Sequence, residues 1–148
     1  GIFWIEYQNY LTKKYINLIK DKRLFFDQKY IEQSEIIDYL SQYYIGFCFY
    51  DMNIIKKNDF NYLSCPSGKL FNYYAAGIPV IGQNIIGLKS VNDYQAGILT
   101  DDTEGEKIAK IVELISKNYY NFSKNSLTAS KNFDFKKAFN LFLEEFNK

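Results

Sequence analysis

The sequence lacks histidine altogether, and this removes the side chain that most often acts as general base or metal ligand near neutral pH. Cysteine is scarce: Cys48 and Cys65 are the two in 148 residues, and their separation matches no zinc motif, so we expect no metal centre. We expect reduced thiols, with a disulfide as the less favoured alternative. No apolar run approaches the roughly 18 residues of a membrane span. Charged residues among the first twenty do not fit a secretion signal, so we expect a cytoplasmic protein.

Excess charge of either sign is also missing. The sequence has 18 lysines and arginines against 17 acidic residues, a formal net charge of +1, so overall electrostatics gives no argument for nucleic acid as a partner. Apolar residues make up 47% of the chain, which is enough to form a core, and the length is that of one ordinary domain. We therefore predict a single domain over residues 1–148.

Short apolar runs alternate with amphipathic stretches along the chain. Five runs predict strands, at 2–5, 24–26, 45–50, 79–82 and 97–99. Helices are predicted at 9–20, 67–76, 87–94 and 119–131, and another follows Ser34, which can cap it. A polar loop is predicted at 51–66. Two further helices are predicted: one opened by a Thr103–Glu106 capping box with a stripe of Ile108, Ile111, Val112 and Ile115, and one capped by Asp134 with Ala138, Phe139, Phe142 and Phe146 buried. This alternation predicts an α/β fold with a Rossmann-like, mostly parallel sheet and flanking helices.

The segment 64–83 carries the strongest functional signal. Ser67, Gly68 and Lys69 stand where a loop enters a helix, and free N–H groups together with the helix dipole favour an anion there. A phosphate-binding P-loop is excluded, because Leu63 and Leu70 occupy positions that require glycine and a hydroxyl residue. The structural alternative is an ordinary capped helix with Lys69 in solvent. However, a lysine in a first turn opposes the dipole, and a bound phosphate would relieve that conflict.

Residues 69–81, Lys-Leu-Phe-Asn-Tyr-Tyr-Ala-Ala-Gly-Ile-Pro-Val-Ile, resemble the signature of GT-B fold glycosyltransferases that use nucleotide-sugar donors. The turn at 86–88 and the strand at 96–99 fall where that family places similar elements. The resemblance implies a C-terminal donor-binding domain that takes a UDP- or GDP-type sugar, with no further cofactor, and a glycan or glycoconjugate acceptor in polysaccharide biosynthesis. It places Lys69 on the donor diphosphate as the catalytic cation, with Ser67 and Gly68 as donors beside it and Asn72 on the ribose. Tyr73, next to Asn72, and Tyr50, after a predicted strand, complete the candidate binding residues.

Two departures from the family keep alternatives open. Ser64 and Asn72 stand where many retaining members have glutamates, and Ser90 stands where many have an acidic residue. A non-catalytic glycosyltransferase-like binding or partner module is therefore the second hypothesis, and a sugar-nucleotide epimerase is a third. The resemblance also implies that a first strand–helix unit and an N-terminal acceptor domain are missing, so we expect no sugar transfer by the isolated chain. It leaves room for peripheral membrane association of the full protein.

Overall fold

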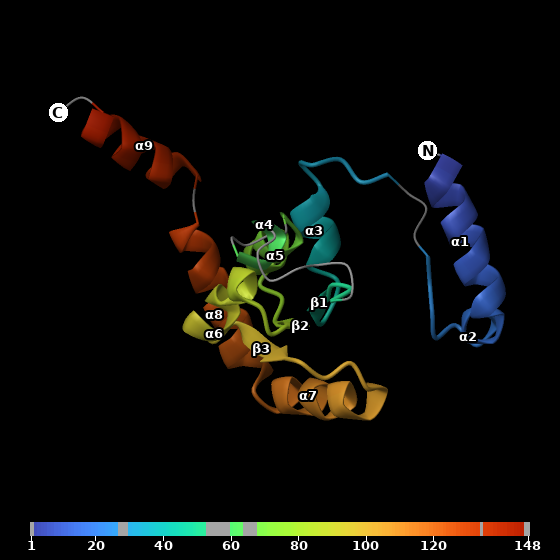
Figure 1. Cartoon of the computed structure of the whole chain (residues 1–148). Coiled ribbons are helices and arrows are strands. Elements are labelled where there is room, and N and C mark those ends of the chain that lie inside the picture. Colours follow the sequence, from blue (N-terminus) through green and yellow to red (C-terminus); the bar gives the residue numbers. More distant parts are fainter. Residues whose placement is uncertain (1, 27–29, 53–59, 64–67, 134, 147–148) are drawn as a thin grey trace. The chain divides into compact units, whose positions relative to one another are not determined.

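The computed structural model describes residues 2–26, 30–52, 60–63, 68–133 and 135–146. The chain divides into two compact units, Gly1–Ile31 and Glu32–Lys148, and each is described by itself. Figure 1 gives the helix and strand labels used below. Within the described residues, no helix has both the length and the apolar character needed to cross a bilayer.

The first unit contains two helices, α1 (Ile2–Lys14) and α2 (Ile16–Lys20). The strands predicted at 2–5 and 24–26 are therefore wrong: the first run is the opening of α1, and the second has no regular structure. A four-residue apolar run does not distinguish a strand from the first turn of a helix by periodicity. The helix predicted at 9–20 is confirmed, with a break at Tyr15 that separates α1 from α2.

The second unit is built on a three-stranded parallel sheet in the order β1 (Gly46–Cys48), β2 (Val80–Gln83) and β3 (Gly97–Thr100). The register pairs Phe47 with Ile81 and Ile81 with Ile98. The last three strand predictions are thus confirmed, and so is a mixed α/β fold with a parallel sheet and flanking helices. Parallel neighbours require crossover connections, and helical segments lie in both crossovers, between β1 and β2 and between β2 and β3.

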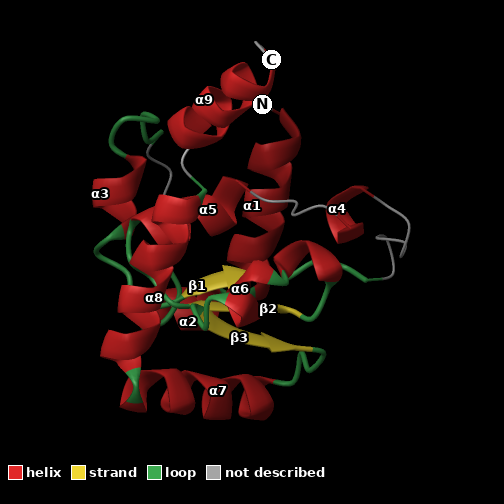
Figure 2. Cartoon of the chain, turned by 90° about the vertical axis from the view of Figure 1, so that its left-hand side faces the viewer, coloured by secondary structure: helices red, strands yellow, loops and turns green. Residues whose placement is uncertain are grey.

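The helices of this unit largely follow the predicted pattern (Figure 2). The caps predicted at Ser34 and at Thr103–Glu106 are wrong. The N-cap residue is Glu35 in the helix Ile36–Leu40 and Glu104 in the helix Gly105–Lys117, and neither side chain makes a capping hydrogen bond. Asp134 lies outside the described residues, and α4 falls inside the stretch predicted as a loop. The elements are α3 (Ile36–Leu40), α4 (Phe60–Leu63), α5 (Gly68–Ala75), the 3₁₀-helix η1 (Ile86–Leu88), α6 (Ser90–Asp93), α7 (Gly105–Lys117), α8 (Tyr119–Asn132) and α9 (Phe135–Phe146).

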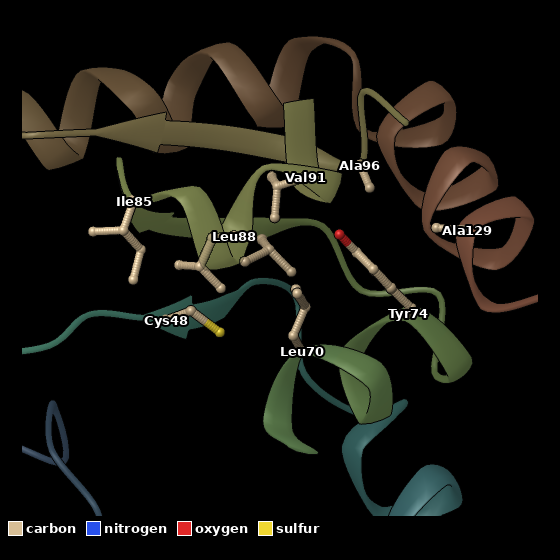
Figure 3. Packing of buried hydrophobic residues seen from close by; sticks show 9 residues of the cluster. Cys48, Leu70, Tyr74, Ile85, Leu88, Val91, Ala96 and Ala129 are labelled. Atoms are coloured by element: carbon tan, nitrogen blue, oxygen red, sulfur yellow. The ribbon is translucent and has the colours of Figure 1, made fainter. Parts of the chain in front are cut away.

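A cluster of buried side chains lies on one face of the sheet, between the strands and the helices α5, α6 and α8 (Figure 3). Side chains alternate along a strand, so Cys48 and Val80 point into this core while Phe47 and Ile81 point to the other face. From the helices come Leu70 and Tyr74 of α5, Leu88 of η1, Val91 of α6 and Ala129 of α8, all fully buried. Burial of Leu70 and Tyr74 holds α5 against the sheet.

The last helix does not bury the face that its pattern predicts. Phe139, Phe142 and Phe146 are 46%, 59% and 77% exposed, so their predicted burial is wrong. An amphipathic pattern predicts a covered face, but in the described part of the chain these three side chains remain exposed. The side chain of Ala138 lies outside the described residues.

Ser126 links α8 by hydrogen bonds to the segments that lead into β2 and β3. Its hydroxyl is fully buried and lies 3.1 Å from the carbonyl oxygen of Ile78 and 3.3 Å from that of Ala96. Ser126→Ala removes this donor and is expected to lower the free energy of unfolding by about 1–2 kcal/mol. The matched control is Thr128→Ala, an exposed hydroxyl on the same helix, expected to change stability by less than about 0.5 kcal/mol. Urea titration followed by far-ultraviolet circular dichroism checks this, and equal midpoints for both variants would contradict it.

Candidate functional site

The carboxyl edge of the parallel sheet is where open α/β folds place their ligands. Two predicted site residues meet at this edge: Lys69 in the first turn of α5 and Tyr50 just after β1. The Lys69 Nζ lies 5.9 Å from the centroid of the Tyr50 ring, within the range of a cation–π contact. Lys69 is exposed and Tyr50 is half-buried against the core. A cation is thus held over a ring at the solvent side of the edge.

The first turn of α5 is open. Gly68 is exposed, and a Cβ placed on it would meet no atom within 4 Å. Packing against the described residues therefore gives no reason for a glycine here. The first N–H groups of a helix have no partner within the helix, so this turn presents donors as well as the Lys69 ammonium. Ser67, the other predicted donor, lies outside the described residues.

Asn72 lies one turn further along α5, beside a separate hollow of about 430 Å³. The hollow combines an amide, a hydroxyl and an ammonium with two aromatic rings, and the rings of Phe71 and Phe133 are 5.1 Å apart between centroids. Such a lining offers both hydrogen bonds and an apolar surface. The lining residues come from α5 and the end of α8: Phe71, Asn72, Ala75, Ser130, Lys131 and Phe133.

Tyr73 does not join the Lys69–Tyr50 pair. Its ring packs directly on Gly46 at the start of β1, where an added Cβ would come within 2.5 Å of it. Burial raises the pKa of the Tyr73 phenol, the neighbouring Cys48 raises it further, and a hydrogen bond with the Phe47 backbone partly offsets the shift. Tyr73 is accordingly a neutral packing residue that positions α5 against β1.

Sequence reasoning missed a second group of residues at the same edge. Asn84 directly follows β2 and donates from Nδ2 to Oδ2 of Asp101, which directly follows β3, over 3.2 Å. Each residue stands two positions after a predicted strand, and the carboxyl ends of parallel strands lie at one edge of the sheet, so this rule could have found them. Asn84 also borders a hollow of about 200 Å³, which is lined by Tyr62 of α4, Asn84, Ile85, Ile86, Lys89, Asn92 and Leu99.

Two more polar side chains near this edge have positions that the sequence did not predict. The Ser90 hydroxyl lies 3.0 Å from the Tyr74 hydroxyl, so Ser90 is engaged with the core helix α5. Gln83, the last residue of β2, is only 5% exposed, and its Oε1 accepts no hydrogen bond within the described part of the chain. Among the described residues, Gln83 therefore brings a buried acceptor without a hydrogen bond to this edge, beside the exposed cation.

Comparison of the chain with models of protein families, with curated protein sequences and with solved structures found no match.

Proposed function

We propose that this chain is the donor-binding half of a GT-B glycosyltransferase, which takes its sugar from a UDP- or GDP-type nucleotide. The observation that carries the proposal is the position of Lys69: an exposed cation in the first turn of α5, over Tyr50, at the carboxyl edge of a parallel sheet. Three features coincide there: the start of a helix, a lysine side chain and the edge of the sheet at which open α/β folds bind ligands. The first two favour an anion such as a diphosphate, and the third favours a ligand at this place.

The chemistry of sugar transfer fits this arrangement. Breaking the bond between sugar and nucleotide leaves negative charge on the departing diphosphate, while the sugar becomes oxocarbenium-like, as in glycoside hydrolysis. A fixed ammonium and oriented N–H groups stabilise charge where it develops. Lys69 takes the first role and the opening turn of α5 takes the second. Neither task requires histidine, which the sequence lacks.

Asn72 supports the same assignment from one turn away. Its amide can donate to or accept from a ribose hydroxyl, and the hollow beside it has aromatic walls that suit a nucleoside. The diphosphate would then lie at Gly68 and Lys69, with the nucleoside toward the hollow between α5 and α8.

A second candidate is a binding module without catalysis. The observation that favours it is the uncharged pair Ser64 and Asn72 where many retaining glycosyltransferases have glutamates. Such a module would still bind a nucleotide sugar or a related ligand, but it would lack the carboxylates that many relatives place near the sugar.

Calorimetric titration with UDP, GDP and the matching monophosphates tests the proposal. We expect a nucleoside diphosphate to bind and the monophosphate to bind more weakly, because the second phosphate supplies the charge that Lys69 recognises. Thermal unfolding gives an independent measurement, since ligand at 100 times its Kd stabilises the folded state by about 2.7 kcal/mol. If no nucleoside diphosphate produces heat or a thermal shift, the donor site is refuted.

A further inference from the structure

A hollow of about 200 Å³ lies beside the first turns of α8, near the corner where α7 and α8 meet (Figure 2). Among the described residues that line it, four carry a carboxamide, the fifth carries a phenyl ring, and none is charged. The lining residues are Gln95, Asn118, Asn121, Phe122 and Asn125. Such a lining offers many hydrogen-bonding groups and one aromatic surface without any charge.

This carboxamide-lined hollow lies at the amino ends of the strands. Gln95 stands two residues before β3. Asn125 is next to Ser126, whose hydroxyl binds the segments that lead into β2 and β3. Lys69 and Tyr50 mark the opposite edge of the sheet, where the strands end. The hollow is therefore separate from the candidate donor site.

Three asparagines of α8 reach the hollow from one side of that helix. Residues three, four and seven positions apart share a helix face, and residues 118, 121, 122 and 125 have this spacing. Asparagine is a preferred N-cap residue, yet the side chain of Asn118, at the N-cap of α8, makes no hydrogen bond to the described first turn of the helix. Its carboxamide is therefore not used to start the helix and belongs to the lining of the hollow.

Asn125 holds the backbone of Gln95 beside the hollow. Its Nδ2 donates to the carbonyl oxygen of Gln95 over 3.1 Å, across 30 positions in the sequence. Gln95 follows α6 with a φ of +52, in the left-handed region that favours glycine at the end of a helix. The turn gives no reason for a glutamine at this position, whereas its carboxamide adds a fourth amide to the lining.

We propose that this hollow binds a neutral carbohydrate, with the carboxamides on sugar hydroxyls and the half-buried Phe122 ring against the apolar side of the sugar. A carboxamide has donors and an acceptor, and a hydroxyl also both donates and accepts, so the two kinds of group match. Sites for small ligands combine an aromatic or apolar surface with a few polar groups in this way. A phosphate or carboxylate is less suitable, because the described lining supplies no cation. The site is independent of the proposed donor site.

Heteronuclear NMR of the isotope-labelled full chain tests the site, with the methyl glycosides of glucose, galactose and N-acetylglucosamine as probes. We expect the side-chain amide signals of the lining to shift and saturate with a Kd of roughly 1–20 mM, since a small site with neutral hydrogen bonds binds weakly. The absence of a saturable shift with all three probes up to about 100 mM overturns the proposal. Shifts confined to the start of α5 overturn it in favour of a sugar at the donor edge. Equal binding by N-acetylglycine N-methylamide, which has peptide groups but no hydroxyls, overturns it in favour of a peptide.

Two variants test the lining itself. Gln95→Gly removes one carboxamide and suits the turn, because glycine adopts a φ of +52 without strain, so its melting temperature should stay the same or rise. Asn121→Ala removes an exposed carboxamide from α8. Each is expected to raise Kd for the glycoside that binds by about threefold to tenfold. The matched control is Asn132→Ala, at the far end of the same helix, which should leave Kd unchanged. Wild-type affinity in both Gln95→Gly and Asn121→Ala overturns the proposal.

Discussion

Gly97→Ala is expected to lower the free energy of unfolding of the second unit by about 3 kcal/mol or more, or to prevent folding. A Cβ at this position would lie 1.9 Å from the carbonyl oxygen of Val80 and 2.7 Å from its nitrogen and carbonyl carbon. These are backbone atoms of the central strand β2, so no side-chain rotation can relieve the clash. β3 would have to move away from β2 and give up the ladder that begins at the Val80–Gly97 pair.

The matched control is Gly105→Ala at the start of α7. No atom of the described residues lies within 4 Å of the added Cβ there, and alanine favours helix, so stability should stay the same or rise by up to about 1 kcal/mol. Both variants are compared by urea titration with far-ultraviolet circular dichroism. Tryptophan fluorescence is the wrong measurement, because the single tryptophan, Trp4, belongs to the first unit. A Gly97→Ala chain as stable as the wild type would refute the close approach of β3 to β2.

The sheet was predictable where apolar runs were bounded by clear turns. Gly77, with φ +68, ends α5, and Pro79 opens the approach to β2, so the helix–strand order could be derived from residue types alone. The run 2–5 lacked such limits, and its apolar residues fit the first turn of α1 as well as a strand. The stripe of α9 shows the opposite failure: its periodicity was correct, but periodicity does not say whether a face is covered by the same chain.

Part of the candidate site could also be predicted from the order of helices and strands. Lys69 and Tyr50 could be placed at one edge because helix starts and strand ends meet there in a parallel sheet. The packing of Tyr73 on β1 could not be predicted, because it depends on the absence of a side chain at Gly46, which lies 27 residues before it in the sequence. Contacts of this kind depend on three-dimensional proximity rather than on local pattern. The same holds for the Asn84–Asp101 bond between the ends of two strands.

Lys69→Ala is expected to weaken binding of a nucleoside diphosphate by about 1.5–3 kcal/mol, roughly a tenfold to hundredfold rise in Kd. The loss reflects a charge-assisted contact with the diphosphate. The fold should not suffer, because Lys69 is exposed and its charge opposes the dipole of α5, while alanine favours helix. Affinity should therefore fall while the melting temperature of the free chain stays constant or rises slightly. Such a divergence separates a binding role from a structural one.

The matched control is Lys110→Ala, which removes an exposed lysine from α7 and keeps the same change in net charge. If Lys69 acts only through the overall charge of the chain, the two variants will weaken binding equally. If it contacts the diphosphate, Lys69→Ala will also reduce the salt dependence of Kd, because one ion pair with the ligand is lost. Tyr50→Phe should keep most of the affinity, since the ring that faces Lys69 remains. Unchanged affinity in Lys69→Ala, measured by calorimetry, would remove this lysine from the site and with it the observation on which the donor-site proposal rests.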